Sequence, residues 1–378
     1  MNWYERRVRE SLEKLGLEVG GGAPHDPQVH DKRFFQRIVS QGSLGLGESY
    51  MDGWWSCAQL DEFFFRLLRA DLGQKARRPW REALAALRAK ILNMQSPRRA
   101  SRVANVHYDL SAEFFQTFLD RRMVYSCAYW KAADSLEQAQ EDKLDLICRK
   151  LRLSSHDRLL DIGCGWGSFL KYACERHRCE SVGVTISGPQ ASYARRDCAG
   201  LSITILECDY REIGSRHQGR FSKIVSIGMF EHVGPKNYRS FMRVVDDMLT
   251  DDGVFVLQTI GDNYSCLRCE PWLDKYIFPN GVAPSVEQIG KAIEGLFVME
   301  DWHNFGPDYY RTLMSWYRNF KDRYPSLNFD PPMGRDKFFR MWEYFFASFG
   351  SAFKARHLQL WQMILSKRAS PSVYLAAR

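Results

Sequence analysis

A strand that breaks into a glycine-rich turn constrains this chain more than any other feature. The apolar run 159–162 is followed by glycine at positions 163, 165 and 167, and an apolar helical pattern begins at Phe169. Glycine permits positive φ and lets the backbone approach a ligand that a Cβ would block. Open α/β sheets bind ligands at the carboxyl ends of their strands, where such a turn lies. The stretch therefore predicts a ligand site at the edge of an α/β sheet.

The spacing of these glycines separates the turn from the dinucleotide fingerprint. That fingerprint is G-x-G-x-x-G with an acid about 20 residues further on. Here the third glycine, Gly167, comes one residue earlier, and Asp161 stands two residues before Gly163. The pattern D-x-G-x-G-x-G resembles the first motif of S-adenosylmethionine-dependent methyltransferases. We expect Asp161 to hold the amino-acid end of that ligand, directly or through water; the alternative is a tight turn that binds nothing.

Strands and helices alternate after residue 140. Strands are expected at about 158–162, 181–186, 202–207, 222–227 and 253–259, mostly separated by helical stretches. This alternation predicts a parallel, doubly wound sheet of the α/β class.

The residues that follow these strands are candidates for ligand contacts, because the carboxyl ends of parallel strands share one edge. After the second strand, Thr185 stands where many nucleotide-binding domains have an acid for the ribose hydroxyls, and Gln190 follows a turn later. Asp209 and Tyr210 close the third strand and offer a carboxylate and a ring for adenine. Glu231 follows the fourth strand and is expected near the sulfonium; the alternative is a surface carboxylate.

Length and composition limit the class of protein. At 378 residues, two domains or one elaborated domain are expected. No stretch approaches the ~20 apolar residues of a membrane span, and the amino terminus lacks the apolar region of a secretory signal. Ten scattered cysteines fit reduced thiols in the cytosol. The lone C-x-x-C at 266–269 has no second pair, so no metal site is expected.

The basic charge and the first hundred residues suggest a surface role. Net charge is +8, which suits nucleic acid or anionic lipid. Residues 1–97 are predicted to form a helical N-terminal domain for membrane docking or dimer contact. Apolar side chains recur at helical spacing in 34–39 and 63–68, and 42–55 is interpreted as a glycine-punctuated loop. The basic amphipathic stretch 80–91 suits an anionic bilayer or its own domain equally.

The catalytic domain is predicted to span 98–378. Its aromatic stretch 104–130 is interpreted as a lid over the nucleotide pocket, and 262–310 as an insertion after the fifth strand. The final helix carries an aromatic stripe at helical spacing, which forms core or the wall of an apolar tunnel: Phe338, Trp342, Phe345, Phe349 and Phe353.

Six stretches together resemble the bacterial cyclopropane-fatty-acid synthases and the related mycolic acid methyltransferases. They are 42–55, 125–130, 160–167, 228–238, 275–281 and 298–306. The resemblance implies a class I methyltransferase domain with a smaller helical N-terminal domain. It also implies methylene transfer from S-adenosylmethionine to the cis double bond of an unsaturated phospholipid. The expected protein is cytoplasmic, lies on the anionic inner face of the membrane and binds no nucleic acid. A homodimer formed through the N-terminal helices is one alternative, and the sequence leaves the oligomeric state open.

The resemblance also assigns site residues. Family cofactor contacts fall on Tyr125, Ser126, Gly163, Gly165, Thr185, Gln190, Asp209 and Tyr210, and we add Asp161 and Gly167 of the turn. A bound bicarbonate is implied as the base that takes a proton when the ring closes. Its holders fall on Cys127, through its backbone, and on Glu231 and Tyr309.

Two positions depart from the family pattern. Gln258 stands where the family usually has histidine, and Phe349 where the final helix usually carries cysteine. Gln258 can donate and accept hydrogen bonds but cannot become cationic. Because both changes touch the anion pocket, a lipid C-methyltransferase that leaves a methyl branch is the alternative. A nucleic-acid methyltransferase, supported only by basic charge, and a non-catalytic lipid-binding relative are further alternatives.

Overall fold

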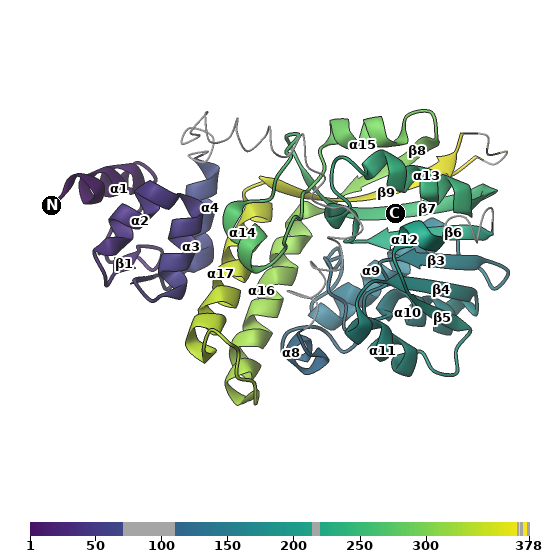
Figure 1. The fold of residues 1–378 in the computed structure, drawn as a ribbon, viewed down its shortest axis with the longest axis horizontal. Coiled ribbons are helices and arrows are strands. Elements are labelled where there is room, and N and C mark those ends of the chain that lie inside the picture. Colours follow the sequence, from purple (N-terminus) through teal and green to yellow (C-terminus); the bar gives the residue numbers. More distant parts are fainter. Residues whose placement is uncertain (71–109, 214–219, 369, 371–372, 376–378) are drawn as a thin grey trace.

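A seven-stranded sheet organises the larger part of this computed structural model, which describes residues 1–70, 110–213, 220–368, 370 and 373–375 (Figure 1). The strands are β3 (Arg158–Ile162), β4 (Glu180–Thr185), β5 (Ile203–Glu207), β6 (Phe221–Ile227), β7 (Leu249–Asp262), β8 (Phe297–Asn304) and β9 (Leu358–Lys367). They lie in the order β5-β4-β3-β6-β7-β9-β8. Strands β3 to β7 pair in parallel, and β9 runs antiparallel to both β7 and β8.

The five predicted strands and the doubly wound fold are confirmed, but β8 and β9 were not predicted. Strand β8 lies within 262–310, so the last part of that predicted insertion belongs to the main sheet. Strand β9 is buried at eight of its ten positions. It therefore lacks the polar alternation of a half-exposed strand, and a short apolar run does not by itself distinguish a strand from a helix.

Helices cover both faces of the sheet. Successive residues of a strand point to opposite faces, so Leu159 and Leu160 of β3 belong to different apolar cores. One face packs against α9 (Leu136–Leu151), α10 (Ser168–His177) and α11 (Gly188–Asp197). The other packs against α13 (Tyr238–Met248) and α15 (Val286–Ile293), while α12 (Tyr210–Ile213) contributes its last residue.

The first 70 residues form four helices and a short ribbon. The helices are α1 (Trp3–Glu13), α2 (Arg33–Gln41), α3 (Ser43–Met51) and α4 (Leu60–Arg69); the ribbon pairs β1 (Gln28–Val29) with β2 (Trp55–Ser56). The helical character predicted for this region is confirmed. The predicted boundary at 97, the basic stretch 80–91 and the first part of the predicted lid fall in 71–109, outside the described residues.

The glycine-rich segment predicted as a loop is instead largely the helix α3. Its glycines serve close packing: a Cβ on Gly45 would lie 2.5 Å from the Arg37 carbonyl oxygen. A Cβ on Gly47 would lie 2.3 Å from Cδ1 of Trp272, in α14 (Pro271–Tyr276). The glycines therefore let α3 approach α2 and α14, at a known cost in helix propensity.

We expect Gly47→Ala to destabilise the protein by about 1–3 kcal/mol, because the added methyl overlaps a fully buried indole. Thermal unfolding of the purified protein measures the effect. Gly290→Ala in α15 is the matched control, since a Cβ there meets nothing within 4 Å. The control should be neutral or slightly stabilising. Equal melting temperatures for Gly47→Ala and wild type would contradict the packing role assigned to Gly47.

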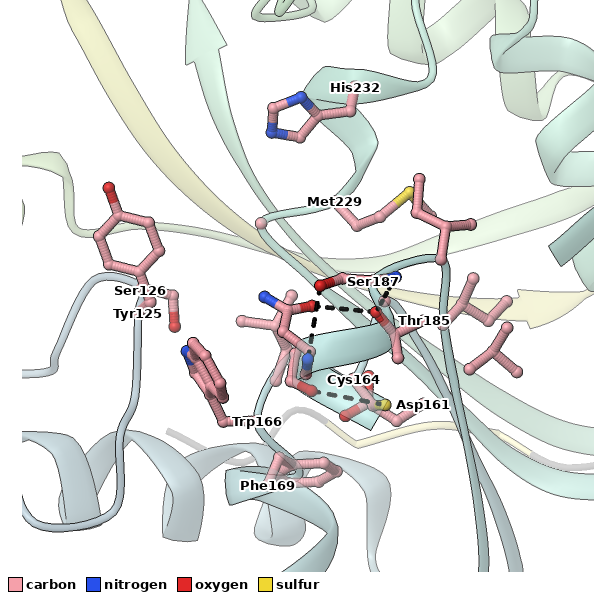
Figure 2. A pocket seen from close by; sticks show the side chains of 18 of the residues that line it. Tyr125, Ser126, Asp161, Cys164, Trp166, Phe169, Thr185, Ser187, Met229 and His232 are labelled. Carbon is pink, nitrogen blue, oxygen red and sulfur yellow. Dashed lines mark hydrogen bonds between the residues drawn. The ribbon is translucent and has the colours of Figure 1, made fainter. Parts of the chain in front are cut away.

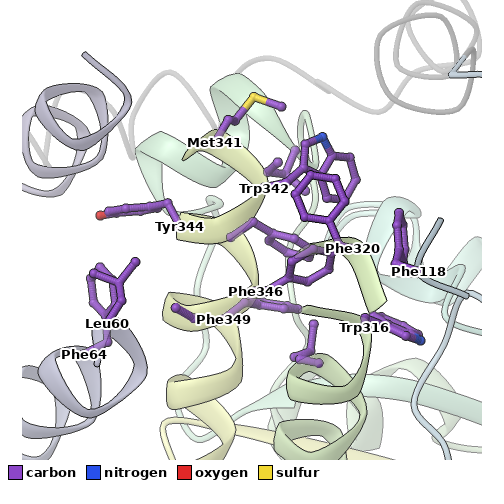
Figure 3. Close-up of a cluster of buried hydrophobic side chains, with 14 of the residues drawn as sticks. Leu60, Phe64, Phe118, Trp316, Phe320, Met341, Trp342, Tyr344, Phe346 and Phe349 are labelled. Atoms are coloured by element: carbon purple, nitrogen blue, oxygen red, sulfur yellow. The ribbon is translucent and has the colours of Figure 1, made fainter. Parts of the chain in front are cut away.

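A large aromatic core joins the first 70 residues to the part of the chain that contains the seven-stranded sheet (Figure 3). Helix α17 (Arg335–Lys354) lies beside α16 (Gly306–Arg323), and the predicted aromatic stripe of the final helix is buried in it. Leu60 and Phe64 of α4 pack on one side of α17, while Phe118, after α8 (Ala112–Gln116), approaches from the other. The short helices η2 (Phe230–His232) and η3 (Tyr324–Ser326) complete the set of elements.

No helix within the described ranges has both the length and the apolar character needed to cross a membrane.

Candidate active site

A cavity of about 200 Å³ opens at the carboxyl ends of β3, β4 and β6 (Figure 2). Nine of the ten predicted cofactor contacts line it: Tyr125, Ser126, Asp161, Gly163, Gly165, Thr185, Gln190, Asp209 and Tyr210. Gly167 does not line it. That glycine precedes α10 with φ +83°, and a Cβ on it would face Ala194 at 3.0 Å. Gly167 therefore serves the helix–helix contact between α10 and α11.

The turn after β3 is shaped by its glycines as the sequence predicts. Gly163 and Gly165 have φ of +87° and +53°. A Cβ on Gly163 would lie 2.7 Å from the Met229 side chain, whereas one on Gly165 would meet nothing within 4 Å. The open space beside Gly165 belongs to the cavity, so a ligand can approach the backbone there. On the neighbouring strand, the Thr185 hydroxyl donates to Gln190 Oε1 at 2.9 Å.

Asp161 and Lys143 place opposite charges on the cavity wall. The Asp161 side chain is buried, and its Oδ1 has no hydrogen-bond partner among the described residues. Burial raises its pKa to about 7, and the nearby Lys143 opposes that rise. Lys143 is itself fully buried, which lowers its pKa to about 8, and its Nζ donates to Ser126 Oγ at 2.9 Å. The pair offers one anionic and one cationic group to a ligand.

Sequence reasoning missed Lys143, although a signal was present. Residues 136, 140, 143, 147 and 150 follow the four-and-three spacing of one face of α9, and all five are buried. A lysine in register with an apolar face is inside the protein only when it has partners. Gln140, one turn earlier, donates to the Ser126 carbonyl oxygen at 2.8 Å. Helix α9 thus fixes the segment that carries Tyr125 and Ser126.

Asp209 already has a cationic partner. The guanidinium of Arg211 donates to both of its carboxylate oxygens, at 2.7 and 2.6 Å. Oδ1 also accepts a hydrogen bond from the Arg211 amide at 3.0 Å, so Oδ2 is the oxygen of Asp209 that can accept a second hydrogen bond from a ligand. Tyr210 lines the same wall, and burial raises its pKa to about 12, so its hydroxyl is a donor at neutral pH.

A second cavity of about 190 Å³ adjoins the first. Tyr125, Ser126, Gly228 and His232 line both. The four predicted catalytic residues line the second cavity: Cys127, Glu231, Gln258 and Tyr309. The structure therefore brings together side chains that lie as much as 182 residues apart in the sequence.

Glu231 is the buried carboxylate of this second cavity, not the surface carboxylate that was the alternative. It is 7% exposed; its Oε1 accepts a hydrogen bond from the Ile260 amide at 2.5 Å, and its Oε2 has no partner among the described residues. Burial raises its pKa to about 7, although hydrogen bonds from the Ile260 amide and Thr259 oppose the rise. A carboxyl group with this pKa can hold or release a proton near neutral pH.

Gln258 presents an amide to the same space. It is 1% exposed, its Oε1 accepts from Gln362 Nε2 at 3.1 Å, and its own Nε2 has no hydrogen-bond partner in the described structure. The Cys127 thiol is fully buried, which raises its pKa well above the ordinary value, so it stays protonated. The cavity thus contains a buried donor and a buried carboxylate oxygen for which the described part of the chain provides no hydrogen-bond partner.

His232 is a further residue that sequence reasoning did not select. It lines both cavities, one position after Glu231, and its place in the first cavity is seen in Figure 2. Burial lowers its pKa to about 4, so the ring is neutral at physiological pH. The neutral His232 ring therefore does not replace the positive charge that a protonated histidine could carry at position 258, where this chain has glutamine.

Apolar side chains, several of them aromatic, also line the second cavity. Its wall includes Trp316, Phe345, Phe349, Leu358 and Leu360. Phe345 and Phe349 stack with ring centroids 5.3 Å apart, and Phe349 lies 6.2 Å from the ring of Tyr309. The aromatic stripe of α17 is therefore both core and cavity wall. Such a space accepts a hydrocarbon chain and keeps water from the carboxylate.

The chain matches known proteins over nearly all of its length. The family model described as mycolic acid cyclopropane synthetase matches residues 79–363. A cyclopropane-fatty-acyl-phospholipid synthase from Escherichia coli strain K12 is 48% identical over 368 residues, which cover 97% of this chain and 94% of that protein.

Solved structures are similar in fold and sequence. The cyclopropane synthase structure from Mycobacterium tuberculosis superposes with a TM-score of 0.64 at 27% identity, covering 71% of this chain and 98% of that one. A mycolic acid cyclopropane synthase in complex with SAH and CTAB has a TM-score of 0.62 at 28% identity, covering 70% and 98%. On the extent of the family match and the identity to the bacterial synthase, the chain belongs to the mycolic acid cyclopropane synthetase family.

Proposed function

We propose that this protein transfers a methylene group from S-adenosylmethionine to the cis double bond of a phospholipid acyl chain, forming a cyclopropane ring. The observation that carries the proposal is the pair of adjoining cavities, one beside the glycine turn with Asp161 and Lys143 in its lining, the other with Glu231 buried in its wall. Four shared lining residues mark where a methyl donor in one would face a hydrocarbon chain in the other.

The first cavity has the groups that S-adenosylmethionine requires. The molecule ends in an amino acid, with an ammonium and a carboxylate, and the cavity offers Asp161 and Lys143. Its adenosine would extend toward Thr185, Gln190 and Asp209. When bound, the cofactor supplies an electrophilic methyl on a sulfonium. The protein's part is to hold that group at the junction of the cavities, oriented toward the second one.

The second cavity would hold the alkene and stabilise the positive charge that forms on it. An alkene is a weak nucleophile, so it must be held against the methyl group with water excluded. The acyl chain acquires positive charge as it is alkylated. The faces of Tyr309, Trp316 and Phe349 stabilise a cation without reacting with it, and the Glu231 carboxylate adds a negative charge in a site of low dielectric.

The groups around Glu231 also fit a bicarbonate ion. A bicarbonate has an O–H donor and several acceptor oxygens; the cavity has the Glu231 Oε2 acceptor and the Gln258 Nε2 donor, both without partners among the described residues. Tyr309 and Cys127 line the same space. When bound, bicarbonate supplies a base for the proton lost on ring closure. Gln258 would hold it by a neutral hydrogen bond.

We expect added bicarbonate to stimulate the wild-type enzyme in degassed buffer, and Gln258→Leu to lose most of that response. Leucine is similar in size but removes the unpartnered donor, which is worth about tenfold in affinity for an anion. The measurement is the initial rate of label transfer against bicarbonate concentration. Gln359→Leu, on the same sheet but outside the cavity lining, is the control. A Gln258→Leu variant with the wild-type response would separate Gln258 from anion binding.

The substrate also sets where the protein works. A phospholipid acyl chain is found in membranes, and the +8 net charge suits an anionic surface. We therefore infer a cytoplasmic enzyme that binds the inner face of the membrane peripherally.

Analysis of lipids from a host that lacks cyclopropane fatty acids tests the proposed function. The lipids are converted to fatty acid methyl esters and treated with dimethyl disulfide, which adds to double bonds. The esters are then separated by gas chromatography and identified by mass spectrometry. A product heavier by one CH2 that does not react supports the cyclopropane. A product of that mass that reacts identifies a methyl-branched lipid instead. Methyl-labelled S-adenosylmethionine that never enters lipid would show a non-catalytic relative.

A further inference from the structure

The second cavity opens beside the connection from β7 to α14. Its inner residues, such as Gln258, are buried, whereas Arg268 and Glu270 at its other end are exposed. Cys266 and Cys269, the C-x-x-C pair of the sequence, lie half-buried between them and also line the cavity. The gradient from buried to exposed lining places the mouth of the cavity at segment 263–270.

Large apolar side chains stand in solvent at this mouth. Tyr264 is 59% exposed, Leu267 is 40% exposed, and Val286, in the first turn of α15, is 56% exposed. The two segments are joined by hydrogen bonds: Ser265 Oγ lies 2.7 Å from Ser285 Oγ, and Gln288 donates to the Cys266 carbonyl oxygen. The three apolar side chains therefore belong to one surface, which we call the rim patch (Tyr264, Leu267 and Val286).

The exposure of the rim patch is fixed by the fold. The Tyr264 amide donates to Asp262 Oδ1 at 2.9 Å, and the Asn263 side chain donates to the Arg356 carbonyl oxygen at 2.9 Å. The Ser265 hydroxyl also donates to Glu287 at 2.9 Å. A segment held on both sides by such bonds keeps its apolar side chains in water at a constant cost, which a binding partner would remove.

Resting on the proposed function, we propose that the rim patch inserts into the phospholipid bilayer and sets the mouth of the acyl cavity against the membrane. An acyl chain leaving a bilayer through such a contact passes from hydrocarbon to the apolar cavity without crossing water. The exposed Arg268 and Arg356 lie beside the patch and suit lipid phosphates. Glu270 and Glu287 balance their charge, so apolar insertion carries the contact.

The test uses a double variant that carries both Tyr264→Ser and Leu267→Ser. The single variant Val298→Ser is its control. Val298 is 41% exposed but lies at the amino end of β8, in register with Ser366 and Val254, at the end of the sheet away from the cavity. Binding is measured by co-sedimentation with phosphatidylcholine vesicles, with and without phosphatidylglycerol. Activity is measured on the same vesicles and on phospholipid in detergent micelles, and SAH affinity by calorimetry.

We expect the double variant to lose about tenfold or more in vesicle affinity on both lipid compositions, since two partly exposed apolar groups are removed. Its KM on vesicles should rise accordingly, with kcat on micelles and SAH affinity as in Val298→Ser and wild type. Unchanged vesicle binding by the double variant would overturn the proposal. A change of oligomeric state with vesicle binding retained would also overturn it, by assigning the patch to a contact between copies.

These outcomes are separable from failure of the proposed function. If wild-type protein modifies no lipid, yet its vesicle binding falls in the double variant, cyclopropane synthesis is refuted and the docking surface is supported.

Discussion

Replacing Glu231 with glutamine is expected to lower kcat by about 100-fold or more, the usual effect of removing a charged group that stabilises a transition state. The amide keeps an oxygen for the Ile260 N–H, which now binds Glu231 Oε1 at 2.5 Å. It removes the negative charge and replaces the Oε2 acceptor by a donor. The loss should therefore fall on chemistry, measured as label transferred into lipid at saturating cofactor. Cofactor affinity should stay within about twofold, because the first cavity does not include Glu231.

The pH dependence of the same pair of proteins tests the cause. The pKa of Glu231 is raised by burial to about 7, so wild-type activity should fall as pH drops below about 7, while the variant's residual rate should not. Because the folded protein holds this proton between the ordinary pKa of 4.5 and about 7, the contribution of Glu231 to stability is largest below pH 4.5 and declines as pH rises from there through about 7. Glutamine should therefore leave the melting temperature at pH 8 unchanged or higher.

The exposed Glu180 provides the matched control, since it is the first residue of β4, lies outside the lining of both cavities and pairs with Arg158 at 2.9 Å. Glu180→Gln should keep full activity. Wild-type turnover in Glu231→Gln would exclude that carboxylate from the mechanism, and a parallel loss of SAH binding would make its role structural.

The features that could be predicted from the sequence are those that depend on residues close to one another along the chain. Each parallel strand from β3 to β7 is a short apolar run that ends where a polar or glycine-rich turn begins, and the turn residues then gather at one edge. Asp161, Thr185, Asp209 and Glu231 follow from that rule, and all four line the two cavities. The position of each residue at the end of a strand was enough to predict that they lie close together, because the carboxyl ends of parallel strands lie at one edge of the sheet.

The missed features depend on partners distant in sequence. Helix α3 looks like a loop until Trp272, 225 residues after Gly47, explains why a side chain is excluded there. Strand β9 is buried on both faces because residues distant in sequence pack on each side of the sheet, with Met363 in one apolar core and Ile364 in another. Lys143 was not selected from the sequence, and the fold places it beside Ser126 and Asp161.

Replacing Lys143 with methionine is expected to weaken SAH binding by about 100-fold, or about 2.7 kcal/mol, a typical result of removing one partner from a buried charged set. Methionine fills similar space, but it cannot donate to Ser126 or attract a carboxylate. Lys143 is also the cation that restrains the pKa of Asp161, so that pKa should rise further and the carboxyl should be protonated at neutral pH. Both charges that face the cofactor's amino acid would then be lost. Calorimetric titration with SAH measures the effect, with the exposed Lys291→Met as control.

The pH profile of cofactor affinity distinguishes this electrostatic role from a packing role. In the wild type, affinity should rise as pH increases through about 7, where Asp161 ionises, and fall above about 8, where Lys143 loses its proton. In Lys143→Met, the fall in affinity above about pH 8 should be absent, and the rise that accompanies ionisation of Asp161 should occur at a higher pH than in the wild type. Wild-type affinity in Lys143→Met, or a variant profile with both wild-type limbs, would mean that neither group meets the cofactor's amino acid. The cofactor would then lie elsewhere along the turn after β3.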